Sequence, residues 1–133
     1  MRGRALLPVA QDLIRGQTPG EPKKRTAINR AYYAAYSEAG AYLRQRNWTP
    51  PANASPHDAT WNRLRTGVQD ADPVRRARRA AVADIGFLLK ARRQKADYRL
   101  TSVLARDEAA SAVKEAQRII QELDQLDAAA PAA

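Results

Sequence analysis

The sequence RTAINRAYYAAYSEAGAYL, residues 25–43, is the stretch that decides the fold. Alanine and tyrosine make up most of it, and its apolar residues recur at steps of three and four, as they do along one side of an α-helix. These apolar positions are Ile28, Ala31, Tyr32, Ala35, Ala39 and Tyr42. We expect one long helix here, with this side covered by another part of the chain.

A second apolar stripe, in residues 74–96, is the expected partner of this helix. Its members are Val74, Ala77, Ala81, Ile85 and Leu88. We expect the two helices to pack together and the functional residues to gather where the second helix ends. These residues are Arg92, Lys95, Asp97 and Tyr98.

The length and composition of the chain limit what it can be. With 133 residues, of which 44% are hydrophobic, we expect a single domain over 1–133, with its core in about 4–126 and a frayed tail over 127–133.

The absence of cysteine excludes disulfides and thiolate chemistry, and with one histidine we expect no metal site and no cofactor. No apolar run is long enough to span a bilayer and Pro8 interrupts any signal-peptide core, so we expect a cytoplasmic protein without membrane contact.

Positive charge dominates the chain and is concentrated in its middle. The net charge of +9 favours contact with phosphate backbones or with an acidic protein partner. The alternative is a solvated basic face that needs no ligand. The cations in question are Arg63, Arg65, Arg75, Arg76, Arg78, Arg79, Lys90, Arg92, Arg93 and Lys95.

Proline and glycine divide the first half of the chain into three expected helices. The first runs over about 4–15, with Pro8 in its first turn. The loop GQTPGEPKK follows, and then the long alanine and tyrosine helix extends to about residue 46, before a pair of prolines prevents it from continuing. A short helix begins at Ser55 or Pro56 and ends before Gly67.

The second half contains two more expected helices. Asp72 followed by Pro73 is a strong helix start, because the aspartate accepts hydrogen bonds from free backbone amides and the proline has no amide to satisfy. That helix runs to about Lys95. The core residues of the last helix are Ala109, Val113, Ala116, Ile120 and Leu123. No segment alternates with period two, so we expect an all-α bundle of four to five helices.

Three phrases of the sequence resemble HEPN domains. NRAYYAAYSEAGAYL, residues 29–43, is similar to the first long helix of that family, which carries an R-A-Y-Y-A-A core. LLKARRQKADYRL, residues 88–100, resembles the R-x-x-A-D-Y ending of a later helix in one branch, and SPHDATWNRL, residues 55–64, is similar to the short middle helix. The three phrases stand in the family's order.

The resemblance implies an antiparallel up-and-down bundle that forms a homodimer. Many HEPN proteins are metal-independent ribonucleases that serve as toxins or defence components beside a small nucleotidyltransferase antitoxin. Their motif is an arginine, four to six residues and a histidine, placed at the dimer cleft. Here the resemblance puts Arg92 at the arginine and Asp97 at the histidine.

The aspartate in place of histidine leaves two function classes open. Histidine exchanges a proton near neutral pH, as cleavage of RNA through its own 2′-hydroxyl requires, whereas an aspartate with an ordinary pKa of about 4 is a poor general acid. The first class is a ribonuclease-type toxin or defence component. The second is a non-catalytic helical dimer that binds nucleic acid, a nucleotide or a nucleotidyltransferase.

The candidate catalytic residues each have a structural alternative. Arg92 would hold a phosphate in a bidentate manner, or pair with Asp97 or with its own helix end. Asp97 would share in catalysis, or accept backbone hydrogen bonds or pair with Arg92 or Arg30 at the helix end. His57 would supply the missing imidazole, or simply start its helix. We expect Arg92 and Asp97 to lie close together and near their copies in the dimer.

The candidate binding residues for nucleic acid or a nucleotide are Arg30, Tyr33, Arg92, Arg93, Lys95 and Tyr98. Tyr33 and Arg30 would line a dimer seam or a ligand cleft, whereas we expect Tyr32 to serve packing. The alternative for Tyr98 is a buried ring with its hydroxyl hydrogen-bonded.

Overall fold

The computed structural model describes residues 3–15, 20–98, 104 and 107–128, and within these ranges the chain forms helices and no strand. In chain order the elements are a 3₁₀ turn, η1 (Gly3–Ala5), the helices α1 (Leu6–Leu13), α2 (Glu21–Arg44) and α3 (Pro56–Asn62), a π-helical turn, η2 (Arg63–Gly67), and the helices α4 (Pro73–Tyr98) and α5 (Glu108–Ala128). The all-α prediction is confirmed.

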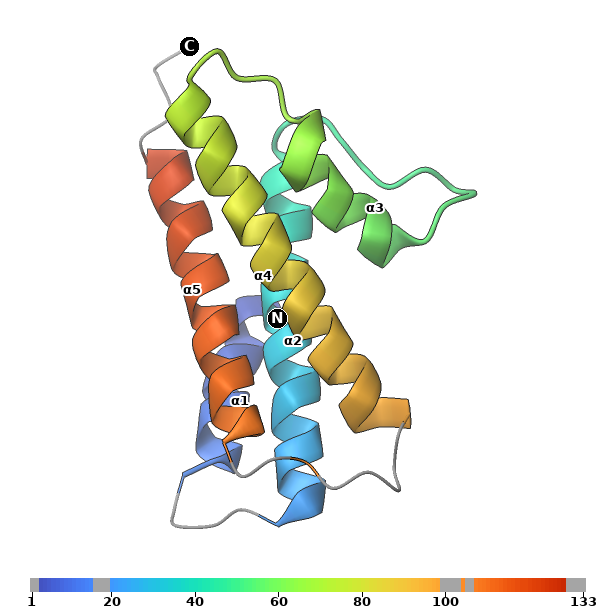
Figure 1. Cartoon of the computed structure of the whole chain (residues 1–133), viewed down its shortest axis with the longest axis vertical. Helices are drawn as coiled ribbons and strands as arrows, with labels where there is room; N and C mark the ends of the chain where they lie inside the picture. The colour runs from blue at the N-terminus through green and yellow to red at the C-terminus, as the bar shows by residue number, and fades with distance from the viewer. Residues whose placement is uncertain (1–2, 16–19, 99–103, 105–106, 129–133) are drawn as a thin grey trace.

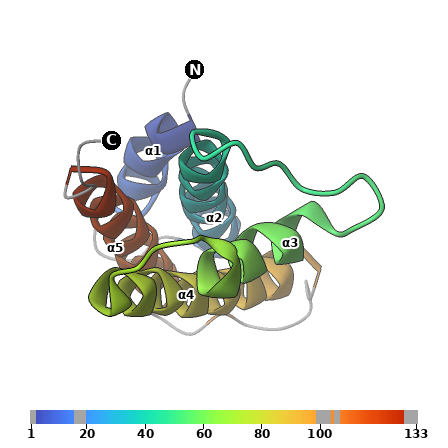
Figure 2. The ribbon, with the colours of Figure 1, turned by 90° about the horizontal axis from the view of Figure 1, so that it is seen from above.

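The alanine and tyrosine helix α2 lies at the centre of the molecule. In the view from above, α1, α5 and α4 stand around it, and α3 lies against α4 (Figure 2). Figure 1 shows α2 and α5 rising in the view while α4 descends across them. All six residues of the predicted α2 stripe are buried, at 2% exposure or less. That part of the sequence prediction is confirmed.

Both ends of α2 follow from local chemistry. The helix starts at Glu21, earlier than expected, with a proline in its first turn, where the missing amide has no consequence. The helix ends at Arg44, and the turn that follows it contains Asn47, whose backbone is left-handed with φ of 61°. The Trp48 amide donates to the Leu43 carbonyl at 3.1 Å, which is the pattern of a Schellman turn. This turn folds Trp48 back toward the end of the helix.

Helix α4 buries a different side from the predicted one. Val74 is 65% exposed, Leu88 is 51% exposed, and Ala77 and Ala81 are exposed as well, so most of the predicted apolar stripe faces outward. Ile85, its remaining member, is partly buried against the core. The buried residues are Arg75, Arg79, Val82, Ala83, Gly86, Leu89, Arg93 and Ala96. The prediction was wrong because it ranked every arginine as a surface residue, whereas three arginines lie on the buried side. Each of those three has a carboxylate or aromatic partner inside the protein.

The ends of α4 are held by capping and by α2. The predicted start is confirmed, because the Val74 amide donates to the Asp72 carboxylate at 2.9 Å. At the other end the guanidinium of Arg25, on α2, donates to the Ala96 carbonyl at 2.8 Å. This contact satisfies a carbonyl of the last turn and fixes that end of α4 against α2.

Helix α5 completes the core as expected. The five core residues predicted for it are all buried. Helical structure extends to Ala128, and the rest of the predicted tail lies outside the described residues. Among the helices of the described part of the chain, none has the length and apolar content needed to cross a membrane.

Candidate functional site

Five aromatic rings from two helices meet beside the second half of α4. We call Tyr32, Tyr33, Tyr36, His57 and Trp61 the aromatic cluster; the tyrosines come from α2 and the other two from α3. The rings of Tyr36 and His57 are stacked, with centroids 4.2 Å apart and an angle of 16° between planes. Tyr33 meets His57 edge-on at 6.0 Å. Such offset and edge-on contacts are the arrangements that aromatic rings prefer.

Helix α3 reaches this position because α4 has a glycine there. A Cβ atom at Gly86 would lie 2.3 Å from the ring of Trp61, which is fully buried. The indole therefore packs directly on the α4 backbone. An ion pair between Lys90 and Asp58, at 2.6 Å, joins the two helices a little further along.

A chain of hydrogen bonds orients the histidine. The hydroxyl of Tyr32 accepts a hydrogen bond from Nε1 of Trp61 at 3.2 Å and lies 2.7 Å from Nδ1 of His57. The indole nitrogen can only donate, so the tyrosine hydrogen is available for Nδ1. The tyrosine oxygen has a second lone pair, so the 2.7 Å contact fits either tautomer of His57; with the ring proton on Nε2, Nδ1 accepts from the hydroxyl.

The protonation states agree with this arrangement. Burial lowers the pKa of His57 below its ordinary value of 6.5, and the positive charges of Arg93 and Lys90 lower it further. Burial raises the pKa of the Tyr32 hydroxyl, which therefore keeps its proton. At neutral pH the histidine is an uncharged ring with one N–H donor.

Arg93 lies next to the aromatic cluster with its guanidinium against tyrosine rings. Its central carbon is 5.2 Å from the ring centroid of Tyr32 and 5.7 Å from those of Tyr33 and Tyr98. Nη1 is 3.6 Å from the Asp97 carboxylate, and buried Nε has no hydrogen-bond partner among the described residues. Arg93 is only 7% exposed, so cation–π contacts with these rings supply much of the stabilisation of its buried charge.

Asp97 connects the end of α4 to the start of the tyrosine motif on α2. The Asn29 amide donates to its carboxylate at 3.1 Å, and the Asn29 oxygen accepts from Arg30 at 2.6 Å. Asp97 therefore has two partners, Asn29 and Arg93, from two helices. The expected pairing of Asp97 with Arg92 or Arg30 is replaced by these two contacts.

The structure brings six of the predicted site residues to one region and places two elsewhere. The six are Arg30, Tyr33, His57, Arg93, Asp97 and Tyr98. Arg92 pairs instead with Glu115 at 2.9 Å and with Glu108, and Lys95 pairs with Glu108 at 3.2 Å, both on α5. The functional roles of all eight stay predictions.

The expected proximity of Arg92 and Asp97 is wrong for a geometrical reason. Five residues along a helix correspond to a rotation of about 140°, so the two side chains leave α4 on different sides. Arg93 and Asp97 are four residues apart and share a side. The buried alternative for Tyr98 is also wrong, since this residue is 72% exposed, whereas the packing role expected for Tyr32 is confirmed by its full burial.

Sequence reasoning missed Asn29, Tyr36 and Trp61 as parts of the site. Asn29 opens the tyrosine motif, and Tyr36 stands four residues after Tyr32, so helical spacing would have placed both on the side of α2 that carries the cluster. Trp61 had no such signal, because its position depends on how α3 lies on α4.

Comparisons with protein-family models, curated proteins and solved structures find no match. Among the described residues no group of three or more His, Cys, Asp or Glu is placed to hold a metal ion. The described side chains of this region are half-buried and exposed rings, one carboxylate acceptor, one imidazole and a buried guanidinium.

Proposed function

We propose that this chain is a HEPN-like helical module that binds single-stranded RNA beside the aromatic cluster without cleaving it. The observation that carries the proposal is the position of Arg93 between the half-buried ring of Tyr33 and the exposed ring of Tyr98. Proteins that bind single strands combine aromatic platforms for the bases with positive charge along the backbone. The exposed side chain of Arg30 and the net charge of +9 supply the second component.

The HEPN-like part of the proposal rests on how the two characteristic phrases meet. Asn29 opens the NRAYYAA phrase and Asp97 belongs to the ADY phrase, and they are joined by a hydrogen bond of 3.1 Å. A chance resemblance of two separate helices would have no reason to bring these positions into contact. An antiparallel up-and-down arrangement is part of the same proposal.

Binding without cleavage follows from the state of the acid–base groups. Nδ1 of His57 is occupied by the Tyr32 hydroxyl, and the lowered pKa of His57 keeps the ring uncharged at neutral pH. In the tautomer that carries its proton on Nε2, this uncharged ring has no free basic site and no labile acidic proton for general acid–base catalysis. The Asp97 carboxylate is an acceptor engaged by Asn29 and Arg93.

The second candidate function is a metal-independent endoribonuclease toxin or defence component controlled by a small nucleotidyltransferase. The observation in its favour is that His57, the single histidine of the chain, lies in the same cluster as Tyr33 and Arg93 rather than elsewhere on the surface. Rearrangement of the Tyr32 hydrogen bond on RNA binding would free Nδ1 as a base.

A homodimer is part of both candidate functions. The outward side of α4 carries an apolar line that includes Val74 and Leu88, at 65% and 51% exposure, with exposed Ala77 and Ala81 between them. Such a line is suited to a second copy of the same helix. Light scattering of wild type and Leu88→Glu tests this: a dimer that becomes a monomer supports it, and a monomeric wild type at high concentration contradicts it.

The binding proposal is tested by RNA affinity at two salt concentrations. Tyr98→Ala should weaken binding about tenfold through loss of one stacking platform, and Tyr98→Phe should retain it. Arg30→Gln should weaken binding and reduce its salt dependence, whereas Arg118→Gln, an equal charge change at an exposed site on α5, should have little effect. Equal losses in both arginine variants would show that only net charge matters.

A cleavage assay in chelator separates the two candidates. Wild type, Arg92→Ala and His57→Ala are compared after their helical content is verified by circular dichroism. Binding with no cleavage by any of them supports the first function. Cleavage by wild type that is lost in His57→Ala would replace it with the second.

A further inference from the structure

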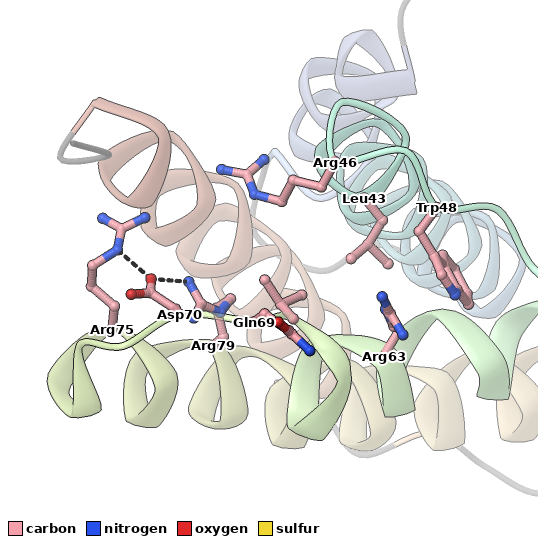
Figure 3. Close-up of a pocket in the computed structure, with 9 residues that line it drawn as sticks. Leu43, Arg46, Trp48, Arg63, Gln69, Asp70, Arg75 and Arg79 are labelled. Carbon is pink, nitrogen blue, oxygen red and sulfur yellow. Dashed lines mark hydrogen bonds and ion pairs between the residues drawn. The ribbon is translucent and has the colours of Figure 1, made fainter. Parts of the chain in front are cut away.

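A pocket of about 460 Å³ lies at the other end of α4, away from the aromatic cluster. Its walls come from the turn after α2, from η2, from the segment before α4 and from the first turns of α4 (Figure 3). We call it the arginine pocket, because four arginines line it with one aspartate and one tryptophan. These residues are Arg46, Arg63, Arg75, Arg79, Asp70 and Trp48.

Two of the arginines are nine-tenths or more buried and share one carboxylate. Arg79 is 2% exposed and Arg75 is 8% exposed. Oδ2 of Asp70 accepts from Nε of Arg75 at 2.7 Å and from Nη1 of Arg79 at 3.1 Å (Figure 3). A single carboxylate therefore serves two buried cations, and positive charge is left in excess.

Guanidinium donors remain unused around the pocket. Nη1 of Arg75, Nη2 of Arg79 and Nε of Arg63 are buried and have no hydrogen-bond partner among the described residues. Arg63 also has no carboxylate within ion-pair distance in the described part of the chain, whereas Arg46 pairs with Asp127 at 2.9 Å. Buried donors are satisfied in nearly all native proteins, and guanidinium groups suit phosphate oxygens.

The pocket also has apolar lining residues. Leu43 and Trp48, from the end of α2 and the turn after it, lie opposite α4, and Val68 belongs to the segment before α4 (Figure 3). Arg63 lies near this lining: its guanidinium is 5.7 Å from the Trp48 ring centroid. A Cβ atom at Gly67 would lie 2.4 Å from Cδ of Arg63, so the arginine stem crosses the glycine closely.

We propose that the arginine pocket binds a small organic phosphate that carries a planar ring, such as a mononucleotide. The phosphate contacts the unused Nε of Arg63 and the unused Nη2 of Arg79, and the ring stacks on Trp48. Arg75 lies beyond Asp70 and adds positive charge without touching the phosphate (Figure 3). Charge-assisted hydrogen bonds from two guanidinium groups recognise the phosphate, and the aromatic wall adds affinity for the ring. This site is separate from the proposed RNA surface and does not depend on that function.

Calorimetric titrations with four probes test the proposal: AMP, phenyl phosphate, inorganic phosphate and adenosine. AMP and phenyl phosphate should bind saturably, inorganic phosphate about tenfold more weakly, and adenosine not measurably. AMP should also change the tryptophan fluorescence of wild type but not that of Trp48→Phe. Absence of saturable binding by both ring-bearing phosphates would overturn the proposal, as would equal affinity for adenosine and AMP.

A matched pair of variants on η2 locates the site. Arg63 lines the pocket, whereas Arg65, two residues later, is 42% exposed at its side chain and pairs with Asp84 outside it. Arg63→Gln should weaken AMP binding about tenfold and Arg65→Gln less than twofold, although both remove one charge. Equal losses would overturn the proposal. Arg79→Gln should abolish binding; Arg63→Gln decides the question if that variant fails to fold.

Discussion

The two ends of α4 both bury arginine, and they do so in different ways. At the C-terminal end Arg93 lies against tyrosine rings, with Asp97 beside it. At the N-terminal end Arg75 and Arg79 share the carboxylate of Asp70 beside a pocket. The face of an aromatic ring attracts a guanidinium group without accepting a hydrogen bond from it. A carboxylate accepts hydrogen bonds from particular N–H groups of the guanidinium, and the other N–H groups remain available to a different acceptor.

The two ends of α4 are therefore suited to bind different ligands. The aromatic end presents partly exposed rings, which suit stacking with bases. The pocket end presents unused guanidinium donors inside a cavity, which suit a compact anion.

The largest effect is expected from the two tryptophans, one at each end. Trp61→Ala should lower the free energy of unfolding by about 4 kcal/mol, because a fully buried ring is removed together with its hydrogen bond to Tyr32. Trp48→Ala should cost about 2 kcal/mol, since that ring is only partly buried. Urea unfolding measures both, and equal losses would mean that the aromatic end is not the better-packed one.

Two adjacent leucines test which side of α4 faces the core. The burial of arginine at both ends of the helix depends on that orientation. Leu89→Ala should cost about 3 kcal/mol because Leu89 is fully buried. Leu88→Ala, at 51% exposure, should change the free energy of unfolding of the monomer by less than about 0.5 kcal/mol. The reverse order would restore the stripe predicted from the sequence and place the arginines outside.

Adjacent arginines test the aromatic end itself. Arg93→Ala should cost about 2 kcal/mol through lost cation–π contacts and packing of its stem, since its side chain is 9% exposed. Arg92→Ala removes a more exposed ion pair with Glu115 and should cost about 1 kcal/mol or less. Chemical denaturation of the pair gives the answer; a larger loss for Arg92 would contradict the burial of Arg93 against the rings.

A smaller effect is expected from the pH dependence of the aromatic end. Because burial lowers the pKa of His57 in the folded protein, the unfolded chain takes up a proton at higher pH than the folded chain does. Wild type should therefore lose stability as the pH falls below about 6.5, whereas His57→Asn, which keeps an acceptor for Tyr32, should lose less over that range. Parallel curves for the two proteins would contradict the shift.

The pocket end should respond at lower pH. Hydrogen bonds from the Asp72 amide and then from Arg75 and Arg79 hold the pKa of Asp70 well below its usual value of 3.8. Its stabilisation is present above that value and is lost as the pH falls through the lower folded-state pKa. Asp70→Asn should be less stable than wild type at neutral pH and should approach it below about pH 4. A difference that persists in acid would show that charge is not the cause.

Sequence periodicity succeeded where the buried side is built from apolar residues. The stripes of α2 and α5 and the start of α4 at Asp72 were predicted correctly because spacing and capping are local properties. Periodicity failed on α4, where Leu88 and Leu89 are both available and hydrophobicity does not choose between them. The sequence placed Arg93 among the binding residues but did not predict its partners Tyr32 and Tyr33, because these come from α2 and meet it only in the folded structure.

The sequence alone was enough to predict an all-helical chain, the approximate bounds of most helices, and Arg30, Arg93 and Asp97 as candidate site residues. The tertiary structure decided which side of α4 is buried, and with it which arginines meet rings, carboxylates or a cavity. The physical reason is that two sides of α4 carry alanine, valine and leucine, and the side that also carries three arginines is the buried one because partners for those arginines are available. Those partners, Tyr32 and Asp70 above all, come from segments distant along the chain.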